Sequence, residues 1–302
     1  ECGSSLLPSA GTGKEAGENK ALNIGAPPAK GMSIVMENLS VRAAGHTILR
    51  DIDLTVAPGS HVAIVGPSGA GKSSLVGVIL GWHQPSSGRV LADGLPVDGR
   101  LDELRHEIAW VDPAVQLWNR SLLQNLSYGT DSGAAFPIGE VIEAADLHGI
   151  LQKLPEGFET PLGEGGALLS GGEGQRVRLG RAMLRPGVRL VILDEPFRGL
   201  DREQRRELLA RARKLWRNAT LLCITHDIGE TQSFERVLII EGGRIVEDGK
   251  PAALAGQSGS RYRALLDAEE AVREGLWSGG NWRRLRLENG RIISQAVAEE
   301  RL

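Results

Sequence analysis

The sequence predicts an α/β protein in which helices cover a largely parallel sheet. Short uninterrupted apolar runs, Leu190–Leu193 and Leu221–Thr225, are typical of strands that are buried on both faces of such a sheet. Segments with helical periodicity lie between the expected strands, namely Lys72–Leu80, Gly172–Leu184 and Arg202–Trp216. Because strands and helices alternate along the chain, a layered α/β domain is the expected architecture.

The N-terminal part divides into a tail and a strand-rich segment. Residues 1–31 contain no aromatic residue and are rich in Gly, Ala, Pro and Ser, so we expect a flexible linker that buries little apolar surface. From residue 32 onward the sequence has the alternating and apolar patterns that are typical of strands. Strands are expected at Ser33–Val41, Ile52–Val56 and His61–Val65, with breaks at residues 43–45 and 58–59.

The middle and the end of the chain suggest two further units. Residues of about 100–180 have mainly helical patterns and are interpreted as an inserted α-helical subdomain. Near the end, Val237–Ile240 and Arg244–Glu247 flank a Gly-Gly turn. A helix at Arg261–Glu274 should then lead to a second small hairpin around Asn289-Gly290. We therefore expect a main domain over residues 32–258 and a C-terminal extension over residues 259–302.

Composition excludes several classes of protein. The 302 residues include 35 basic and 38 acidic side chains, a formal net charge of −3, whereas a nucleic-acid-binding domain usually has a clear basic excess. Cys2 and Cys223 are the only cysteines, which fits a reducing compartment better than a disulfide framework. No apolar stretch approaches the roughly 18 residues that a membrane span requires.

A phosphate-binding loop follows the expected strand His61–Val65. The residues match the pattern G-x-x-x-x-G-K-[ST] between a strand and a helix. Backbone amides in such a loop form an anion-binding nest that the helix N-terminus extends. Lys72 should reach the β- and γ-phosphates, and the Ser73 hydroxyl should ligate Mg²⁺. The predicted loop comprises Gly66, Pro67, Ser68, Gly69, Ala70, Gly71, Lys72, Ser73 and Ser74.

Two acids and a histidine follow other buried strands. Asp194 and Glu195 come directly after Leu190–Leu193, at the strand end where ligands bind in open α/β sheets. We expect Asp194 to hold Mg²⁺ indirectly and Glu195 to orient or deprotonate the attacking water. His226 ends the strand Leu221–Thr225, and its interpretation as a sensor of the γ-phosphate depends on the family.

The segment Leu169-Ser170-Gly171-Gly172-Glu173-Gly174-Gln175 resembles the LSGGQ signature of ATP-binding cassette (ABC) ATPases, and it lies between the phosphate loop and the acidic strand, as in that family. The resemblance spans residues of about 33–255. It implies a P-loop NTPase (RecA-like) core sheet with an antiparallel β subdomain and an inserted α-helical subdomain. It also implies a dimer in which Ser170, Gly171, Gly172 and Glu173 face ATP held by the opposite subunit. Asp201 resembles the acid that communicates across that dimer, and His226 matches the switch histidine.

The chain departs from the family pattern at two positions. Ala43 stands where an aromatic ring usually stacks on adenine, and His46 is displaced from that position by three residues. Pro113 stands where a glutamine usually follows an apolar strand, so that Asp112 or Gln116 would have to take over its role. Both departures leave open a degenerate, regulatory cassette.

The leading hypothesis is a nucleotide-binding domain that hydrolyses ATP with Mg²⁺ to power an ABC exporter at the cytoplasmic face of the inner (plasma) membrane. Leu154-Pro155-Glu156-Gly157-Phe158 resembles the segment that precedes the signature in exporters. The expected partners are a second copy of the domain and a transmembrane permease, which the arm before the domain leads us to expect in the same polypeptide. No nucleic-acid partner is expected. A soluble ABC ATPase acting on nucleic acid or ribosomes is the alternative.

Overall fold

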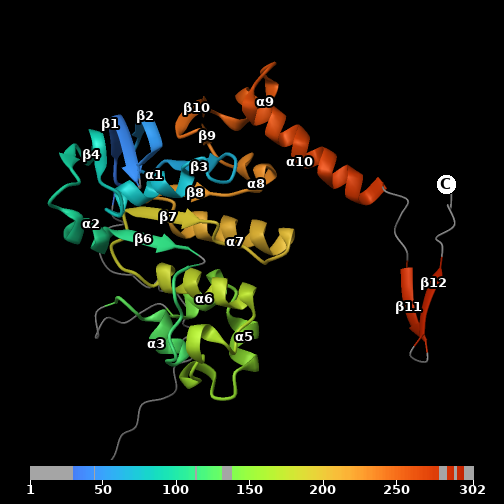
Figure 1. The fold of residues 1–302 in the computed structure, drawn as a ribbon. Helices are drawn as coiled ribbons and strands as arrows, with labels where there is room; N and C mark the ends of the chain where they lie inside the picture. Colours follow the sequence, from blue (N-terminus) through green and yellow to red (C-terminus); the bar gives the residue numbers. More distant parts are fainter. Residues whose placement is uncertain are drawn as a thin grey trace, which may run out of the picture.

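The computed structural model describes residues 30–43, 45–112, 114–130, 138–278, 284–288 and 291–295, and side chains up to Glu274. The tail expected over residues 1–31 lies almost wholly outside these ranges, as does Pro113. Figure 1 shows a central sheet with a second sheet and α1 on one side and further helices on the other.

The central sheet has six strands in the order β10-β9-β3-β8-β7-β6. All neighbouring pairs are parallel except β9 and β10, which form an antiparallel hairpin. The expected parallel sheet is therefore confirmed. Its strands are β3 (His61–Val65), β6 (Ile108–Val111), β7 (Leu190–Asp194), β8 (Thr220–Ile224), β9 (Arg236–Glu241) and β10 (Arg244–Gly249).

A second, antiparallel sheet has the order β2-β1-β4-β5. It consists of β1 (Ile34–Ala43), β2 (His46–Val56), β4 (Pro85–Ala92) and β5 (Leu95–Pro96). The sequence predicted β2 only from Ile52, but the strand begins at His46 because it pairs with β1 over its whole length. β4 was not predicted: only Val90 and Ala92 of its residues are buried, so its sequence lacks a strong apolar signal.

Most of the helices follow β6, and a smaller group lies near the C-terminus (Figure 1). The range of about 100–180 expected to be helical includes β6, which is an edge strand of the central sheet, so the helical part of that range follows β6. The α-helices are α1 (Lys72–Ile79), α2 (Leu101–Glu107), α3 (Leu122–Leu126), α4 (Ile138–Ala144), α5 (His148–Lys153), α6 (Gly171–Met183), α7 (Arg202–Leu215), α8 (Ile228–Thr231), α9 (Pro251–Gly256) and α10 (Arg261–Ser278). Two short 3₁₀ turns, Gly157–Glu159 and Glu164–Gly166, precede α6. The expected second hairpin forms from β11 (Arg284–Glu288) and β12 (Arg291–Gln295).

The core has two parts, one on each face of the central sheet. Successive strand residues point to opposite faces. In β3, Val62 and Ile64 pack with the antiparallel sheet and α1, whereas Ala63 and Val65 pack with the helical side. The apolar runs are therefore buried on both faces, as the sequence indicates. No helix in the described ranges has the length and apolar character that a membrane crossing needs.

Candidate active site

The strand order brings three polar loops to one edge of the central sheet. β8 lies between β3 and β7, and the three strands are parallel, so their carboxyl ends meet at the same edge. The phosphate loop follows β3, Asp194 and Glu195 end or follow β7, and His226 follows β8. This is the edge at which ligands bind in open parallel sheets. The predicted residues of these three loops therefore come together.

The phosphate loop turns tightly between β3 and α1. Gly66 has φ +149°, and a Cβ atom there would lie 2.1 Å from the carbonyl oxygen of Ile240 on β9, so only glycine fits. Lys72 opens α1, is almost completely buried, and donates hydrogen bonds through Nζ to the carbonyl oxygens of Gly66 and Pro67, both at 2.9 Å. Burial lowers the Lys72 pKa, and the nearby Glu195 and Asp194 carboxylates oppose this. The ammonium group thus lies within its own loop, on the side of the two acids.

Ser73 and Asp194 form a hydrogen-bonded pair at the end of β7. The Asp194 carboxyl is buried, and burial raises its pKa, while the hydrogen bond from Ser73 lowers it. Mg²⁺ is usually bound through one or two carboxylates together with substrate phosphates. A hydroxyl and a carboxylate beside a phosphate loop fit this donor set. Within the described residues there is no cluster of three or more metal-binding side chains, so phosphate oxygens and water would have to complete the coordination.

Glu195 and His226 follow the neighbouring strands β7 and β8, and their side chains are in contact. His226 Nε2 lies 2.6 Å from Glu195 Oε1. Glu195 has φ +45°, a left-handed conformation that costs energy for a side chain with a Cβ and is typically retained where function requires it. Both residues line a cavity of about 460 Å³ that also includes Ser68 of the phosphate loop. The carboxylate is therefore held beside the position that a bound phosphate would occupy.

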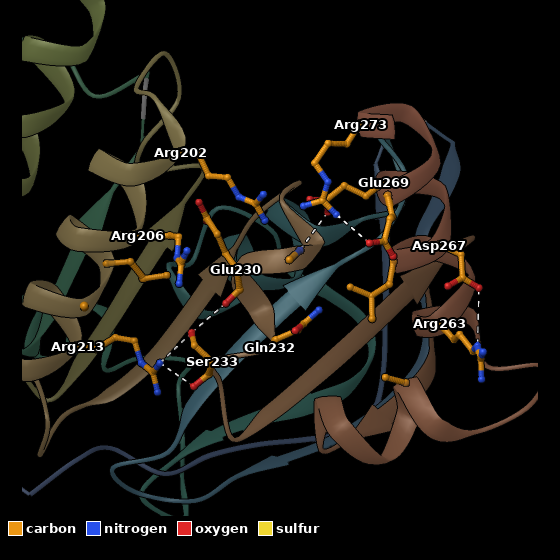
Figure 2. Close-up of a pocket in the computed structure, with 16 residues that line it drawn as sticks. Arg202, Arg206, Arg213, Glu230, Gln232, Ser233, Arg263, Asp267, Glu269 and Arg273 are labelled. Carbon is orange, nitrogen blue, oxygen red and sulfur yellow. Dashed lines mark hydrogen bonds and ion pairs between the residues drawn. The ribbon is translucent and has the colours of Figure 1, made fainter. Parts of the chain in front are cut away.

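The loop that carries His226 is tied to two other helices. Asp227 caps α8, and Arg205 of α7 forms ion pairs with Asp227 (Nη2–Oδ2, 3.0 Å) and with Glu230 (Nε–Oε1, 3.4 Å). On the other side, Glu269 of α10 accepts a hydrogen bond from the Gly229 N–H at 3.0 Å. A buried hydrogen bond of 2.8 Å joins Tyr262 and Thr231 in addition. Figure 2 shows Glu230 beside a cavity of about 810 Å³, between the α7 arginines and Glu269 and Arg273 of α10.

The buried Glu230 carboxyl has an altered pKa. Its side chain is 4% exposed, and burial together with the Asp227 charge raises the pKa to about 7, although Arg205 and Arg202 act in the opposite direction. Glu230 Oε1 accepts no hydrogen bond within the part of the chain that the structure describes. A carboxyl that titrates near neutrality thus lies four residues from His226.

The predicted signature residues open α6. Ser170 is the N-cap of this helix: its Oγ accepts from the Glu173 N–H at 3.3 Å, and the Glu173 carboxylate accepts from the Ser170 N–H at 2.9 Å. This reciprocal arrangement is a capping box. Ser170 and Gly171 are exposed, and Gly172 lies so close to Leu200 that a Cβ would approach it to 2.5 Å. The helix N-terminus therefore presents an open anion-binding end.

The signature does not line the cavity that contains Glu195 and His226. Among the described residues, the N–H groups of Gly171 and Gly172 have no acceptor outside their own helix. Asp201, the other residue expected to act across a dimer, is exposed, and its carboxylate caps α7 by accepting from the Gln204 N–H at 2.9 Å. The predicted signature residues are therefore separate, within one copy of the chain, from the cavity that Glu195 and His226 line.

The loop after β6 contains the candidates for the missing glutamine. Asp112 lies close enough to Asp194 for its charge to raise the Asp194 pKa. Gln116 is exposed, and its backbone carbonyl accepts a hydrogen bond from Arg181 of α6 at 3.1 Å. Of the two candidates, Asp112 is the one whose charge reaches the expected metal-binding carboxylate.

The β1–β2 hairpin brings together the two residues that bear on adenine binding. Ala43 and His46 are separated by three residues in sequence but are direct partners across the β1–β2 hairpin. Residues that lie directly opposite each other in an antiparallel pair point to the same face. The imidazole of His46 is exposed and lies beside Ala43, the position at which the family resemblance places an aromatic ring.

Sequence reasoning missed the residues that support the site. Arg205 and Asp227 link α7 to the His226 loop, Lys153 of α5 forms an ion pair with Glu173, and Tyr262 and Glu269 hold α8 from α10. No local pattern marks these residues because each pair is 20 or more positions apart in the chain. A strand order inferred from the sequence would have brought the elements together, but not the individual side chains.

Comparison with known proteins agrees with this geometry. A family model described as "ABC transporter" matches residues 49–198, which include the phosphate loop, the signature and the Asp194–Glu195 pair. The chain is 38% identical over 224 residues to an ATP-dependent lipid A-core flippase of Chromobacterium violaceum, covering 73% of this chain and 38% of that protein. A flippase of the same name from Pseudomonas aeruginosa is 38% identical over 242 residues, covering 78% and 40%. The chain contains an exporter-like ABC nucleotide-binding domain.

A solved structure supports the same assignment. The nucleotide-binding domain is similar to a bacterial Atm1-family ABC exporter with ATP bound, with a TM-score of 0.75 and 27% sequence identity, covering 83% of this chain and 46% of that one. The expected α/β fold of this ABC domain, with its P-loop, is thereby confirmed. The chain spans about two fifths of the length of the two flippases.

Proposed function

We propose that this ABC domain binds ATP with Mg²⁺, closes as a dimer around two nucleotides, and hydrolyses them to drive export through a membrane domain. The observation that carries this proposal is the convergence of Lys72, the Ser73–Asp194 pair and the Glu195–His226 pair at one sheet edge. The N-terminus of α6 is exposed and does not line the cavity of Glu195 and His226, which supports the dimer.

The residues of the phosphate loop would bind the nucleotide. Amide groups of residues 66–74 would surround the phosphates, and the Lys72 ammonium would leave the carbonyl oxygens of Gly66 and Pro67 to contact the β- and γ-phosphates. Ser73 would bind Mg²⁺ directly, and Asp194 would hold it indirectly. When bound, the metal would neutralise charge that develops on the phosphate oxygens.

Glu195 and His226 would handle the attacking water. The Glu195 carboxylate would accept a proton from the water and orient it toward the γ-phosphate. His226, at 2.6 Å from this carboxylate, would hold the side chain in place and contact the γ-phosphate. The partner's Ser170 hydroxyl and helix N-terminus would stabilise the phosphate oxygens from the opposite side. Hydrolysis therefore depends on closure of the dimer.

The partners follow from the length of the relatives. Both flippases are about two and a half times as long as the matched region, and the printed name of the Atm1-family neighbour is that of an exporter. We therefore propose a transmembrane permease as the partner, with this domain at the cytoplasmic face of the membrane. The substrate that is exported would be selected by the permease.

Steady-state phosphate release by the chain with ATP and Mg²⁺ tests this function. Lys72→Ala should abolish hydrolysis because it removes the contact with the β- and γ-phosphates. Glu195→Gln should still bind ATP but turn over at least ~100-fold more slowly, since it removes one acid–base group. If the wild-type chain hydrolyses ATP measurably and both variants lose this activity, a degenerate, regulatory cassette is also excluded. Near-normal turnover by Glu195→Gln, with ATP binding intact, would overturn the role given to Glu195.

A further inference from the structure

The signature helix carries a negative charge at its phosphate-binding end. The family signature LSGGQ ends on a neutral glutamine, whereas this chain has Glu173 at that position. The Glu173 side chain is 11% exposed, and the hydrogen bonds from Lys153 and from the Ser170 N–H lower its pKa to about 2. It is therefore ionised at neutral pH, three residues from the serine that is expected to face the γ-phosphate.

Such a charge opposes the binding of an anion at the same helix end. The amide groups at the N-terminus of a helix favour negative ligands, and a carboxylate already bound there competes with them for the same positive potential. Unlike the glutamine of the signature, Glu173 brings this competing charge. A compensating positive charge close to Glu173 would restore the balance.

Lys153 supplies that charge. It is the last residue of α5, and its Nζ donates to Glu173 Oε1 at 2.7 Å, while Glu173 Oε2 accepts from the Ser170 N–H. The two carboxylate oxygens are thus divided between the ammonium and the capping box. Within the described residues Lys153 is the only basic side chain in an ion pair with Glu173.

We propose that Lys153 is a positioning residue of the nucleotide site, which neutralises Glu173 and holds it in the capping box so that the N-terminus of α6 can accept the γ-phosphate of the partner subunit's ATP. This inference rests on the proposed function of the signature. In this assignment the Lys153–Glu173 pair replaces the neutral glutamine. Lys153 itself contacts no phosphate and acts through Glu173.

Three variants test the proposal: Lys153→Met, Glu173→Gln and the double variant. Lys153→Met leaves an unpaired carboxylate beside the phosphate, so the ATP concentration for half-maximal hydrolysis should rise about two- to fivefold, the size expected for one charge at a helix end. Adding Glu173→Gln to Lys153→Met should lower this ATP concentration again, because it removes the unpaired carboxylate. In the Glu173→Gln background, Lys153→Met should have no further effect, because no charge is left to neutralise.

The alternatives give different results. If Lys153 only ties α5 to α6 through this ion pair, Glu173→Gln should raise the required ATP concentration and lower the melting temperature as much as Lys153→Met does, and adding it should not rescue Lys153→Met, so the proposal is wrong. If the pair is an inert surface contact, Lys153→Met should change nothing, and the proposal is again wrong. Arg263→Met, which removes an exposed ion pair with Asp267 on α10, is the matched control. Lys72→Ala, measured in parallel, separates these outcomes from a failure of the proposed function, since it should be inactive if the function holds.

Discussion

At the scale of single residues, the site depends on side chains that the fold holds in unfavourable states. Lys72 and Asp194 are both buried. Burial lowers the pKa of Lys72 and raises the pKa of Asp194, so it favours the neutral form of each side chain. Glu195 adopts a left-handed backbone conformation. A bound nucleotide and its metal would supply further opposite charges to these groups, so ligand binding should relieve part of the cost of burial.

His46 provides a prediction at the same scale. Because it lies across the hairpin from Ala43, we predict that its ring stacks on adenine in place of the missing aromatic residue. His46→Ala should raise the KM for ATP about five- to tenfold and leave kcat unchanged, since base–aromatic stacking contributes on the order of 1–3 kcal/mol. Steady-state ATPase kinetics measure both constants.

His106→Ala is the control for this experiment, because His106 is an exposed histidine on α2, away from the three site loops. His46→Trp should restore or lower the KM. An unchanged KM in His46→Ala would show that adenine is held by other residues.

At the scale of elements, α8 connects His226, the proposed catalytic histidine, to the rest of the molecule. Four residues are too few to form a stable helix alone, so α8 depends on its contacts with α7 and α10. This junction contains both acidic and basic side chains, namely Asp227, Glu230, Glu269, Arg202 and Arg205. Figure 2 shows these helices around the cavity between α7 and α10.

The raised pKa of Glu230 predicts that stability depends on pH. The folded pKa is about 7, above the ordinary 4.5, so folding favours the protonated carboxyl. This contribution to the free energy of unfolding is complete below about pH 4.5 and is lost as the pH rises through 7; its full size is on the order of 3 kcal/mol. In urea denaturation at pH 5 and pH 8.5, Glu230→Gln should show a smaller loss of stability at high pH than wild type.

Glu203→Gln serves as the control for that measurement, because Glu203 is an exposed acid in the first turn of α7. Equal losses in wild type and Glu230→Gln would mean that Glu230 does not titrate between these pH values in the folded protein.

How far the sequence predicts the structure also depends on the element. Strands buried on both faces, such as β7 and β8, have continuous apolar runs and were located to within one residue. The helix α6 is confirmed to within one residue at each end, since Ser170 and Glu173 supply a recognisable cap. β4 and the first half of β2 were missed because pairing with β1, rather than their own apolar pattern, specifies them.

The residues of the candidate site also differ in how well the sequence predicts them. Residues that belong to a local motif, such as Lys72 and Ser170, can be predicted because the chemistry needs them at fixed spacing. Residues that act through tertiary contacts, such as Lys153 and Arg205, cannot, because their partners lie on other elements.

At the scale of the whole molecule, we propose that one copy of the chain is an incomplete enzyme. The phosphate loop, Glu195 and His226 share one sheet edge, while the N-terminus of α6 is exposed, and we propose that it contacts a nucleotide held by another copy. ATP should therefore join two copies, and a variant that binds ATP without hydrolysing it should keep them joined.

Analytical ultracentrifugation of Glu195→Gln with ATP and Mg²⁺ tests whether ATP joins two copies. We expect a species of twice the 32.3 kDa chain mass with ATP, a monomer without nucleotide, and a monomer when Ser170→Glu is added to block the partner's phosphate. A Glu195→Gln chain that is saturated with ATP and remains monomeric, or a dimer that Ser170→Glu does not disturb, would contradict this proposal.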